Sequence, residues 1–368
     1  MDFINNWNRE DLLLLSIMLK MNWQTMHKTV KDCNSMSDLL ESPYLPSYLS
    51  DKSKEQSLFG ANIEVEKEKA QIQIDLCNEN GYEILTYWDE KYPDLLKQIP
   101  HPPCILYIYG TLSNPDSLSI SIVGTRRNTM YGKITAERFA EYFASRKIII
   151  TSGMANGIDT ISHKAAIKAN GITYAVIASG LDTISSHFQK QVSEKIVETG
   201  GAIISEYPCG VKALNPFFLQ RNRIISGISK ATIVVESAYK GGALNTARNA
   251  FEQQREVYAV PGRLSDTRSE GTNLLIKKNV ASPALRPEDI LEDLGINTDE
   301  GIFSSEITRN FDSPDEEKIF NILNLEPMQI DDIANNSGMA VSILNVKLLE
   351  MEFKGLVKSL PGKHYIRL

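Results

Sequence analysis

Short apolar runs alternate with longer amphipathic stretches through the middle of the chain, from Ser119 to about residue 283. The apolar runs predict strands at 119–123, 148–151, 172–178, 201–205, 231–236 and 256–260. Apolar residues at helical spacing predict helices near 133–146, 159–169, 187–199, 216–228, 243–254 and 271–278. This order is typical of a doubly wound α/β fold with a parallel sheet, in which ligands bind at the carboxyl ends of the strands.

The region before this alternation is mainly helical in pattern. Residues 7–42 predict short helices, and residues 61–80 predict a further helix that leads to strands near 83–87 and 105–109. A helix-hairpin-helix DNA binder needs glycines where its turn approaches a phosphate, but residues 20–24 contain none. We therefore expect the first 75 residues to form a helical packing or interaction module.

The region after the alternation predicts a linker and a small domain. Residues 284–314 are polar and acidic, whereas residues 315–368 predict three short helices and a hairpin around Pro361-Gly362, the order of a winged helix. Lys347 is the only basic residue of the third helix, so a protein contact is at least as well supported there as DNA binding. The expected organisation is a helical module at 1–75, an α/β domain at 76–283, a linker at 284–314 and a winged-helix-like domain at 315–368.

The first strand of the alternation ends in a turn suited to anions, Gly124-Thr125-Arg126-Arg127, with a helix following. Backbone amides and the helix dipole favour an anion at such a turn, and arginine guanidinium groups bind phosphate oxygens in pairs. Gly124 and Gly132 enclose seven residues, so this is not a P-loop, and no stretch reads G-x-G-x-x-G. The alternative is a surface turn whose arginines are simply solvated.

Four later strand-end regions carry similar chemistry. Gly153 to Asp159 contains two glycines, hydroxyl groups and an aspartate suited to a helix N-cap, and Lys190 follows the third strand. Phe217 to Arg223 combines aromatic rings with arginines, as single-strand binders do, although these apolar residues could equally face the core. Gly241-Gly242 opens a further helix that contains Thr246. Together these regions indicate an extended cleft.

Charge and composition narrow the function further. The net charge is −7, yet residues 119–283 hold 21 Lys and Arg against 12 Asp and Glu, a net charge of +9 between two acidic flanks. Such a basic centre is expected where one domain meets a polyanion. The four scattered cysteines form no C-x-x-C motif, and no apolar run approaches a membrane span, so we expect reduced thiols, a cytoplasmic location and no metal site. His163 has no partner nucleophile or carboxylate pair nearby, so we expect it to be packed rather than catalytic.

Several motifs in this order resemble the DNA processing protein A family, also called Smf, and the resemblance covers most of the chain. The motifs are VGTRRNTMYG, ITSGMANGIDTISHKAAI, SEYPCG, FFLQRNRIISGIS, GGALNTARNAFEQQREVYAVPG and EGTNLLIKKNVA. The resemblance implies an extended Rossmann-like domain that binds single-stranded DNA and helps to load the RecA recombinase during natural transformation. It also implies a homodimer, an N-terminal helical module and often a C-terminal winged helix. From the residues themselves we expect no cofactor and no enzymatic activity.

The resemblance also assigns roles to individual residues. Gly124, Thr125 and Arg126 match the phosphate-binding turn, and Arg221, Asn222 and Arg223 match the basic segment of the groove. The chain departs from the family pattern at residue 22, where a glycine is missing, at Ser185-Ser186 in place of Tyr-Pro, and at Leu219 in place of proline. The full set expected to bind DNA is Gly124, Thr125, Arg126, Arg127, Gly153, Lys190, Phe217, Arg221, Asn222, Arg223, Gly241, Gly242 and Thr246.

An enzyme is the alternative from a different class. The same Rossmann variant resembles phosphoribohydrolases with the motif P-G-G-x-G-T-x-x-E, whose glutamate handles the ribose. Aligned on Gly241-Gly242, Lys240 replaces the proline and Arg248 the glutamate, and Glu252 lies one helical turn too late. A nucleotide hydrolysis assay distinguishes this reading from DNA binding.

Overall fold

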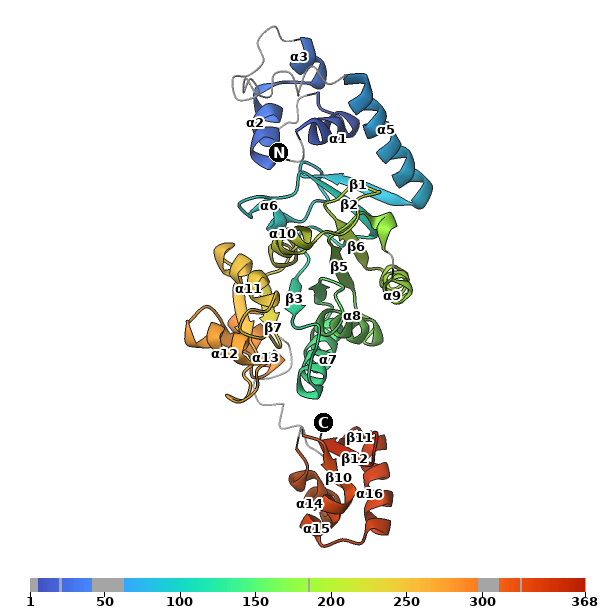
Figure 1. The fold of residues 1–368 in the computed structure, drawn as a ribbon, viewed down its shortest axis with the longest axis vertical. Coiled ribbons are helices and arrows are strands. Elements are labelled where there is room, and N and C mark those ends of the chain that lie inside the picture. The colour runs from blue at the N-terminus through green and yellow to red at the C-terminus, as the bar shows by residue number, and fades with distance from the viewer. Residues whose placement is uncertain are drawn as a thin grey trace. The chain divides into compact units, whose positions relative to one another are not determined.

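The computed structural model describes residues 6–19, 22–41, 63–184, 186–296, 311–324 and 326–367 (Figure 1). Its contacts separate two compact units. The first contains residues up to 287 without 129–135, and the second contains 129–135 and the residues from 288 onward. Each unit is described below by itself.

The first unit is organised on a sheet of nine described strands in the order β1-β2-β6-β5-β4-β3-β7-β8-β9. The strands are β1 (Tyr82–Thr86), β2 (Ile105–Gly110), β3 (Ser119–Val123), β4 (Ile149–Ser152), β5 (Thr173–Ile177), β6 (Ala202–Ser205), β7 (Ala231–Val234), β8 (Glu256–Ala259) and β9 (Ser282–Pro283). The strands from β3 to β9 pair in parallel with one another, so the predicted doubly wound fold and its six central strands are confirmed. The order reverses between β3 and β7, which is where such sheets bind ligands.

The pairing of the two preceding strands was not evident from the sequence. β1 and β2 form an antiparallel pair, and β2 adds antiparallel to β6, with Tyr107 opposite Ser205. Ile105 to Ile108 are buried, so this addition also covers an edge of the parallel sheet that would otherwise expose unpaired backbone groups.

Helices cover both faces of the sheet. Ala175, Ile177 and Ile203 point into one core, and the intervening Val176 and Ile204 point into the other, as strand periodicity requires. The connecting helices are α6 (Asp94–Lys97), α7 (Met130–Ser145), α8 (Ile158–Lys168), the short 3-10 helix η1 (Leu181–Thr183), α9 (His187–Glu198), α10 (Asn215–Gly227), α11 (Ala243–Glu252) and α12 (Glu270–Lys277). These bounds confirm the helices predicted in the central region.

The N-terminal helices belong to the same unit as the sheet. They are α1 (Arg9–Met18), α2 (Trp23–Asp32), α3 (Met36–Glu41) and α5 (Ile63–Asn80), and their apolar residues join the core that contains Ile177 and Ile203. Asn8 and Asn22 cap α1 and α2 through their side-chain oxygens. Thus Asn22, in the turn without glycine, starts a helix. The expected domain boundary at residue 75 falls inside α5.

The second unit contains α13 (Pro287–Asp293) and a small domain that has the predicted three helices and hairpin. The domain consists of α14 (Pro314–Ile322), β10 (Met328–Gln329), α15 (Ile330–Ser337), α16 (Val341–Phe353), β11 (Val357–Leu360) and β12 (His364–Arg367), with sheet order β10-β12-β11. The expected linker at 284–314 contains α13, which buries Ile290 and Leu291. Residues 297–310 of that expected linker lie outside the described part of the chain.

No helix among the described residues combines the length and apolar character that membrane crossing requires.

Candidate functional site

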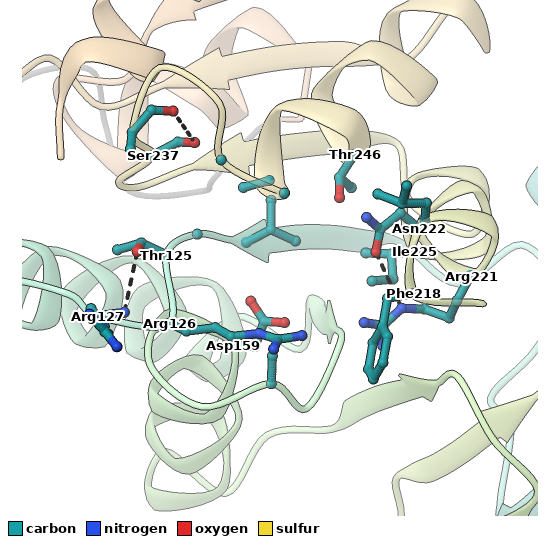
Figure 2. A pocket seen from close by; sticks show the side chains of 18 of the residues that line it. Thr125, Arg126, Arg127, Asp159, Phe218, Arg221, Asn222, Ile225, Ser237 and Thr246 are labelled. Carbon is teal, nitrogen blue, oxygen red and sulfur yellow. Dashed lines mark hydrogen bonds between the residues drawn. The ribbon is translucent and has the colours of Figure 1, made fainter. Parts of the chain in front are cut away.

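A cavity of about 570 Å³ lies where the strand order reverses, between the loops that follow β3 and β7 (Figure 2). The loop after β3 contributes Gly124 to Arg127, and the loop after β7 contributes Ser237, Ala238 and the start of α11. The amide of Thr125 donates to the Glu236 carbonyl (2.8 Å), and the Thr125 carbonyl accepts from the amide of Ile158 (3.3 Å). These bonds join the β3 loop to the β7 loop and to the start of α8.

The lining of this cavity is positively charged. Among the described residues of the lining, those that carry charge are Arg126, Arg127, Arg221 and Asp159. The net charge of +2 attracts an anion, and the attraction is stronger beside protein of low dielectric constant than in bulk water.

Arg126 is the exposed arginine that reaches into the cavity. Figure 2 shows it extending toward Phe218 and Arg221, while Arg127 points away from them. Its guanidinium carbon lies 5.2 Å from the centre of the Phe218 ring. A second cavity of about 200 Å³ adjoins the first, and Arg126, Phe218 and Arg221 line both. Arg126 therefore presents a positive charge beside an aromatic face.

Helix α11 adds a second anion-binding feature. It begins directly after Gly241-Gly242, has no side-chain cap and carries no acidic residue in its first turn. Its N-terminal dipole therefore faces the cavity without an internal counter-charge. A Cβ atom on Gly241 would lie 2.2 Å from the Ser237 hydroxyl oxygen, so a larger residue there would have to displace that side chain.

Arg221 lines the cavity but is almost entirely buried, with an exposed fraction of 4%. Its Nη1 group donates to the backbone carbonyls of Gly153 (2.7 Å) and Val176. Burial, together with the nearby charge of Arg126, lowers the pKa of Arg221 to about 10, while Asp159 opposes this shift. The guanidinium nevertheless stays protonated at neutral pH.

The structure brings together most of the residues expected to bind DNA. The large cavity is lined by Gly124, Thr125, Arg126, Arg127, Arg221, Asn222, Gly241, Gly242 and Thr246, and Gly153 lines the adjoining one. Their assignment as DNA ligands stays a prediction, but their assembly at one sheet edge fits it.

Three of the expected residues lie elsewhere. The ring of Phe217 stacks on Tyr207 with centroids 4.4 Å apart. Arg223 forms a half-buried ion pair with Glu206 (2.5 Å). Lys190 is exposed on α9, and neither it nor the other two lines either cavity. Their roles in DNA binding also remain predictions.

Phe218 is not in the expected set of DNA-binding residues, although it belongs to the segment in which aromatic rings were expected to stack on bases, and its side chain lines the cavity. Phe218, Arg221, Asn222 and Ile225 all line the cavity and follow the i, i+3, i+4, i+7 spacing of one helix face. This spacing places Phe218 on the same face of α10 as Arg221, whereas Phe217 lies off that face, so the sequence contained a signal that distinguishes the two rings.

His163 is packed, as predicted. The Thr173 hydroxyl donates to the Ile150 carbonyl (2.6 Å) and lies 2.6 Å from His163 Nδ1, so Nδ1 carries the proton and donates to Thr173. Burial, aided by the charge of Arg221, lowers the pKa of His163 to about 3. The ring is therefore neutral at physiological pH.

The lining does not favour the hydrolase alternative. Asp159 is the one carboxylate among the described lining residues, and it is buried, whereas Arg248 and Glu252 line neither cavity. Burial raises the pKa of Asp159, opposed by Arg221 and by backbone amides. Among the described residues no cluster of metal-ligand side chains occurs.

Comparisons with known proteins agree with this architecture. The family model of DNA recombination-mediator protein A matches residues 83–295, and that of the DprA winged helix domain matches residues 308–363. Protein Smf of Escherichia coli (strain K12) is 37% identical over 305 residues, which cover 81% of this chain and 81% of that protein. DNA processing protein DprA of Bacillus subtilis (strain 168) is 36% identical over 282 residues, which cover 76% of this chain and 91% of that protein.

Two solved structures are similar as well. The X-ray structure of DNA processing protein A from Streptococcus pneumoniae has a TM-score of 0.63 and 27% identity, covering 78% of this chain and 98% of that chain. The Helicobacter pylori protein, whose structure concerns its single-stranded DNA binding mode, has a TM-score of 0.52 and 30% identity, covering 58% of this chain and 95% of that chain. With these matches and the shared domain order, the chain belongs to the DNA recombination-mediator protein A family, whose members are called DprA or Smf.

Proposed function

We propose that this protein binds single-stranded DNA in the cavity between the β3 and β7 loops. The observation that carries the proposal is the net charge of +2 in the lining of this cavity. The N-terminus of α11 and the ring of Phe218 face the same cavity. Phosphates bind guanidinium groups and helix N-termini, and bases stack on aromatic rings. The binding mode named for the Helicobacter pylori relative supports the same ligand.

The shape of the site favours a single strand over a duplex. The two adjoining cavities meet at Arg126 and Phe218, so one can hold a phosphate while a base reaches the ring. In a duplex the bases are paired and stacked, and exposing one of them costs a few kcal/mol. A single strand exposes its phosphates and its bases without this cost.

An electrophoretic mobility shift assay with single- and double-stranded oligonucleotides of one sequence tests this function. We expect the single strand to shift at a markedly lower protein concentration. Equal shifts, or no shift of the single strand at low salt, contradict the proposal. A nucleotide hydrolysis assay on the same preparation tests the enzyme alternative.

Changing Phe218 to alanine is expected to weaken single-strand binding by about 1–3 kcal/mol per stacked base, with little change in salt dependence. The reason is that stacking neutralises no phosphate. The measurement is the dissociation constant across a salt series.

Phe217→Ala is the matched control for this prediction, because the two residues are adjacent on α10 and Phe217 stacks on Tyr207 instead. We expect it to bind DNA more nearly like the parent. Equal losses for both variants argue for a general effect on α10, and a larger loss for Phe217→Ala restores the sequence-based assignment.

We further propose that the protein acts as a homodimer and passes its DNA to a RecA recombinase during natural transformation. Membership of the family supports both statements. Analytical ultracentrifugation tests the first, and assembly of RecA filaments on DNA already covered by a single-strand binding protein tests the second. A monomer at micromolar concentrations contradicts the homodimer.

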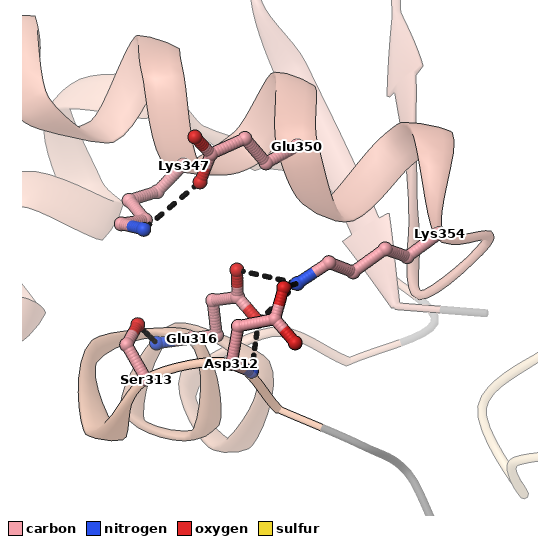
Figure 3. A network of polar contacts seen from close by, with 6 residues as sticks. All are labelled: Asp312, Ser313, Glu316, Lys347, Glu350 and Lys354. Carbon is pink, nitrogen blue, oxygen red and sulfur yellow. Dashed lines mark hydrogen bonds and ion pairs between the residues drawn. The ribbon is translucent and has the colours of Figure 1, made fainter.

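The winged helix presents an unusual surface for a DNA reader. Lys347 pairs with Glu350 (2.9 Å), and Lys354 pairs with Asp312 (2.5 Å) and Glu316 (2.8 Å), as Figure 3 shows. These carboxylates already neutralise the lysines of α16 and its C-cap. The outer face of α16 is apolar and exposes Ile343, Val346, Leu349 and Phe353.

Removal of residues 315–368 is therefore expected to leave single-strand affinity nearly unchanged. A matched measurement of both forms by fluorescence anisotropy checks this, with circular dichroism to verify the fold of the shortened chain. A tenfold or greater loss would show that the winged helix reads DNA directly.

A further inference from the structure

The carboxylate of Asp159 holds the backbone of two loops at the cavity. Burial raises the pKa of this carboxylate, and hydrogen bonding from the backbone amides of Ala155, Gly124 and Gly153 opposes that rise. Asp159 Oδ2 lies beside Gly153, 2.7 Å from where a Cβ atom of that residue would stand. Gly124 begins the loop that carries Arg126, and Gly153 begins the loop after β4. Asp159 itself lies in the first turn of α8 and is buried. One side chain therefore fixes the β3 loop, the β4 loop and the start of α8 together.

Arg221 completes this arrangement from the other side. Its Nη1 group donates to carbonyls of Gly153, at the end of β4, and Val176, in β5. The side chain starts on α10, so it joins that helix to both strands. A Cβ atom on Gly153 would lie 2.7 Å from both guanidinium Nη atoms and from Asp159 Oδ2, so Gly153 has no room for any side chain. The two charged groups enclose this glycine.

We propose that Asp159 and Arg221 are positioning residues, which hold the β3 and β4 loops in the conformation that binds phosphate without themselves contacting DNA. This inference rests on the proposed single-strand function. Arg221 is therefore assigned a different role from Arg126, although the sequence places both in basic motifs. The burial of Arg221 and its use of two backbone carbonyls support this distinction.

Asp159→Asn gives the sharpest test, because the two possible roles predict opposite changes. Removing a carboxylate from a cavity that binds an anion raises the local positive charge, so a purely electrostatic role predicts tighter DNA binding. A positioning role predicts weaker binding, because the amides of Gly124 and Gly153 lose their charged acceptor. We expect about a fivefold loss of affinity, the equivalent of about 1 kcal/mol for one hydrogen bond.

Glu252→Gln is the matched control, because it removes one carboxylate from an exposed position on α11 that lines neither cavity. We expect affinity equal to or slightly above that of the parent. Arg221→Gln is the second variant, and its dissociation constant is measured across a salt series. The salt slope is the steepness with which the logarithm of the affinity falls as the logarithm of the salt concentration rises. For a positioning residue this slope stays at the parent value, whereas loss of a phosphate ligand reduces its magnitude by about 0.7.

Hydrogen exchange of the DNA-free proteins provides a readout that does not depend on binding. We expect faster exchange at residues 124–127 and 153–157 in Asp159→Asn and Arg221→Gln, and unchanged exchange in Glu252→Gln. Tighter or equal DNA binding by Asp159→Asn, or a reduced slope for Arg221→Gln with unchanged exchange, overturns the inference. If the parent fails to bind single strands, the proposed function fails, while the exchange data still decide whether these residues position the loops.

Discussion

Replacing Arg126 with alanine is expected to weaken single-strand binding about thirtyfold, the equivalent of about 2 kcal/mol for a hydrogen bond to a charged group. Arg126 is exposed, lies at the junction of the two cavities and forms no ion pair with a carboxylate among the described residues. Its guanidinium is therefore available to a phosphate. Loss of one phosphate contact should also flatten the salt dependence by about 0.7 in slope, the value for single strands.

The measurement is affinity against salt for two oligonucleotides of unrelated sequence. The losses should be similar for both, because a phosphate contact carries no base information. Arg138→Ala is the control, because it removes an exposed arginine on α7 that lines neither cavity. If Arg126→Ala keeps the affinity and the slope of the parent, DNA does not bind in this cavity.

Arg223→Ala is expected to keep the salt slope of the parent, although the motif suggests that Arg223 binds a phosphate. Its ion pair with Glu206 occupies the guanidinium away from both cavities. The same salt series compares it directly with Arg126→Ala, and a matching fall in slope would restore Arg223 as a phosphate ligand.

The stability of the protein is expected to fall by about 2 kcal/mol between pH 7 and pH 5 because of His163 alone. The folded state holds the ring neutral, with a pKa of about 3, while the unfolded state has the ordinary value of 6.5. Below pH 6.5 the unfolded chain therefore binds a proton that the folded chain cannot, and acid favours unfolding. The loss grows until the pH approaches the folded pKa.

The physical reason is the buried environment of the ring. Nδ1 already donates to Thr173, and Nε2 is buried with no hydrogen-bond partner among the described atoms, so a proton there would have no acceptor. Urea unfolding at pH 7 and pH 5 measures the effect. His163→Gln should lose about 2 kcal/mol less over this interval than the parent, and His101→Gln, at an exposed position, should behave like the parent. Equal acid losses in the parent and His163→Gln contradict the assignment.

The winged helix shows how far local pattern can determine a domain. Leu344, Leu348 and Met351 recur at helical spacing on α16 and are buried, so local pattern is sufficient to predict this helix. The pairing of Lys354 with Asp312 and Glu316 joins residues 38 or more positions apart. That pairing depends on the packed fold.

The alternation of apolar runs and amphipathic stretches determined the strands, the helices and the sheet edge where Gly124 and Gly241 meet. These features depend on local periodicity and on the parallel pairing that crossover helices impose, and both can be read along the chain. The antiparallel addition of β2 to β6 could not be read in this way, because these two strands are far apart in the sequence and local pattern does not specify which strands pair.

Three arginines with similar sequence surroundings have different environments in the fold. Arg126 remains exposed, Arg221 binds carbonyls 45 and 68 residues away, and Arg223 pairs with a carboxylate 17 residues away. The sequence by itself determined that this sheet edge is basic. Only the tertiary structure decided which guanidinium is free to meet a phosphate, because burial and partners are set by segments that come together after the chain folds.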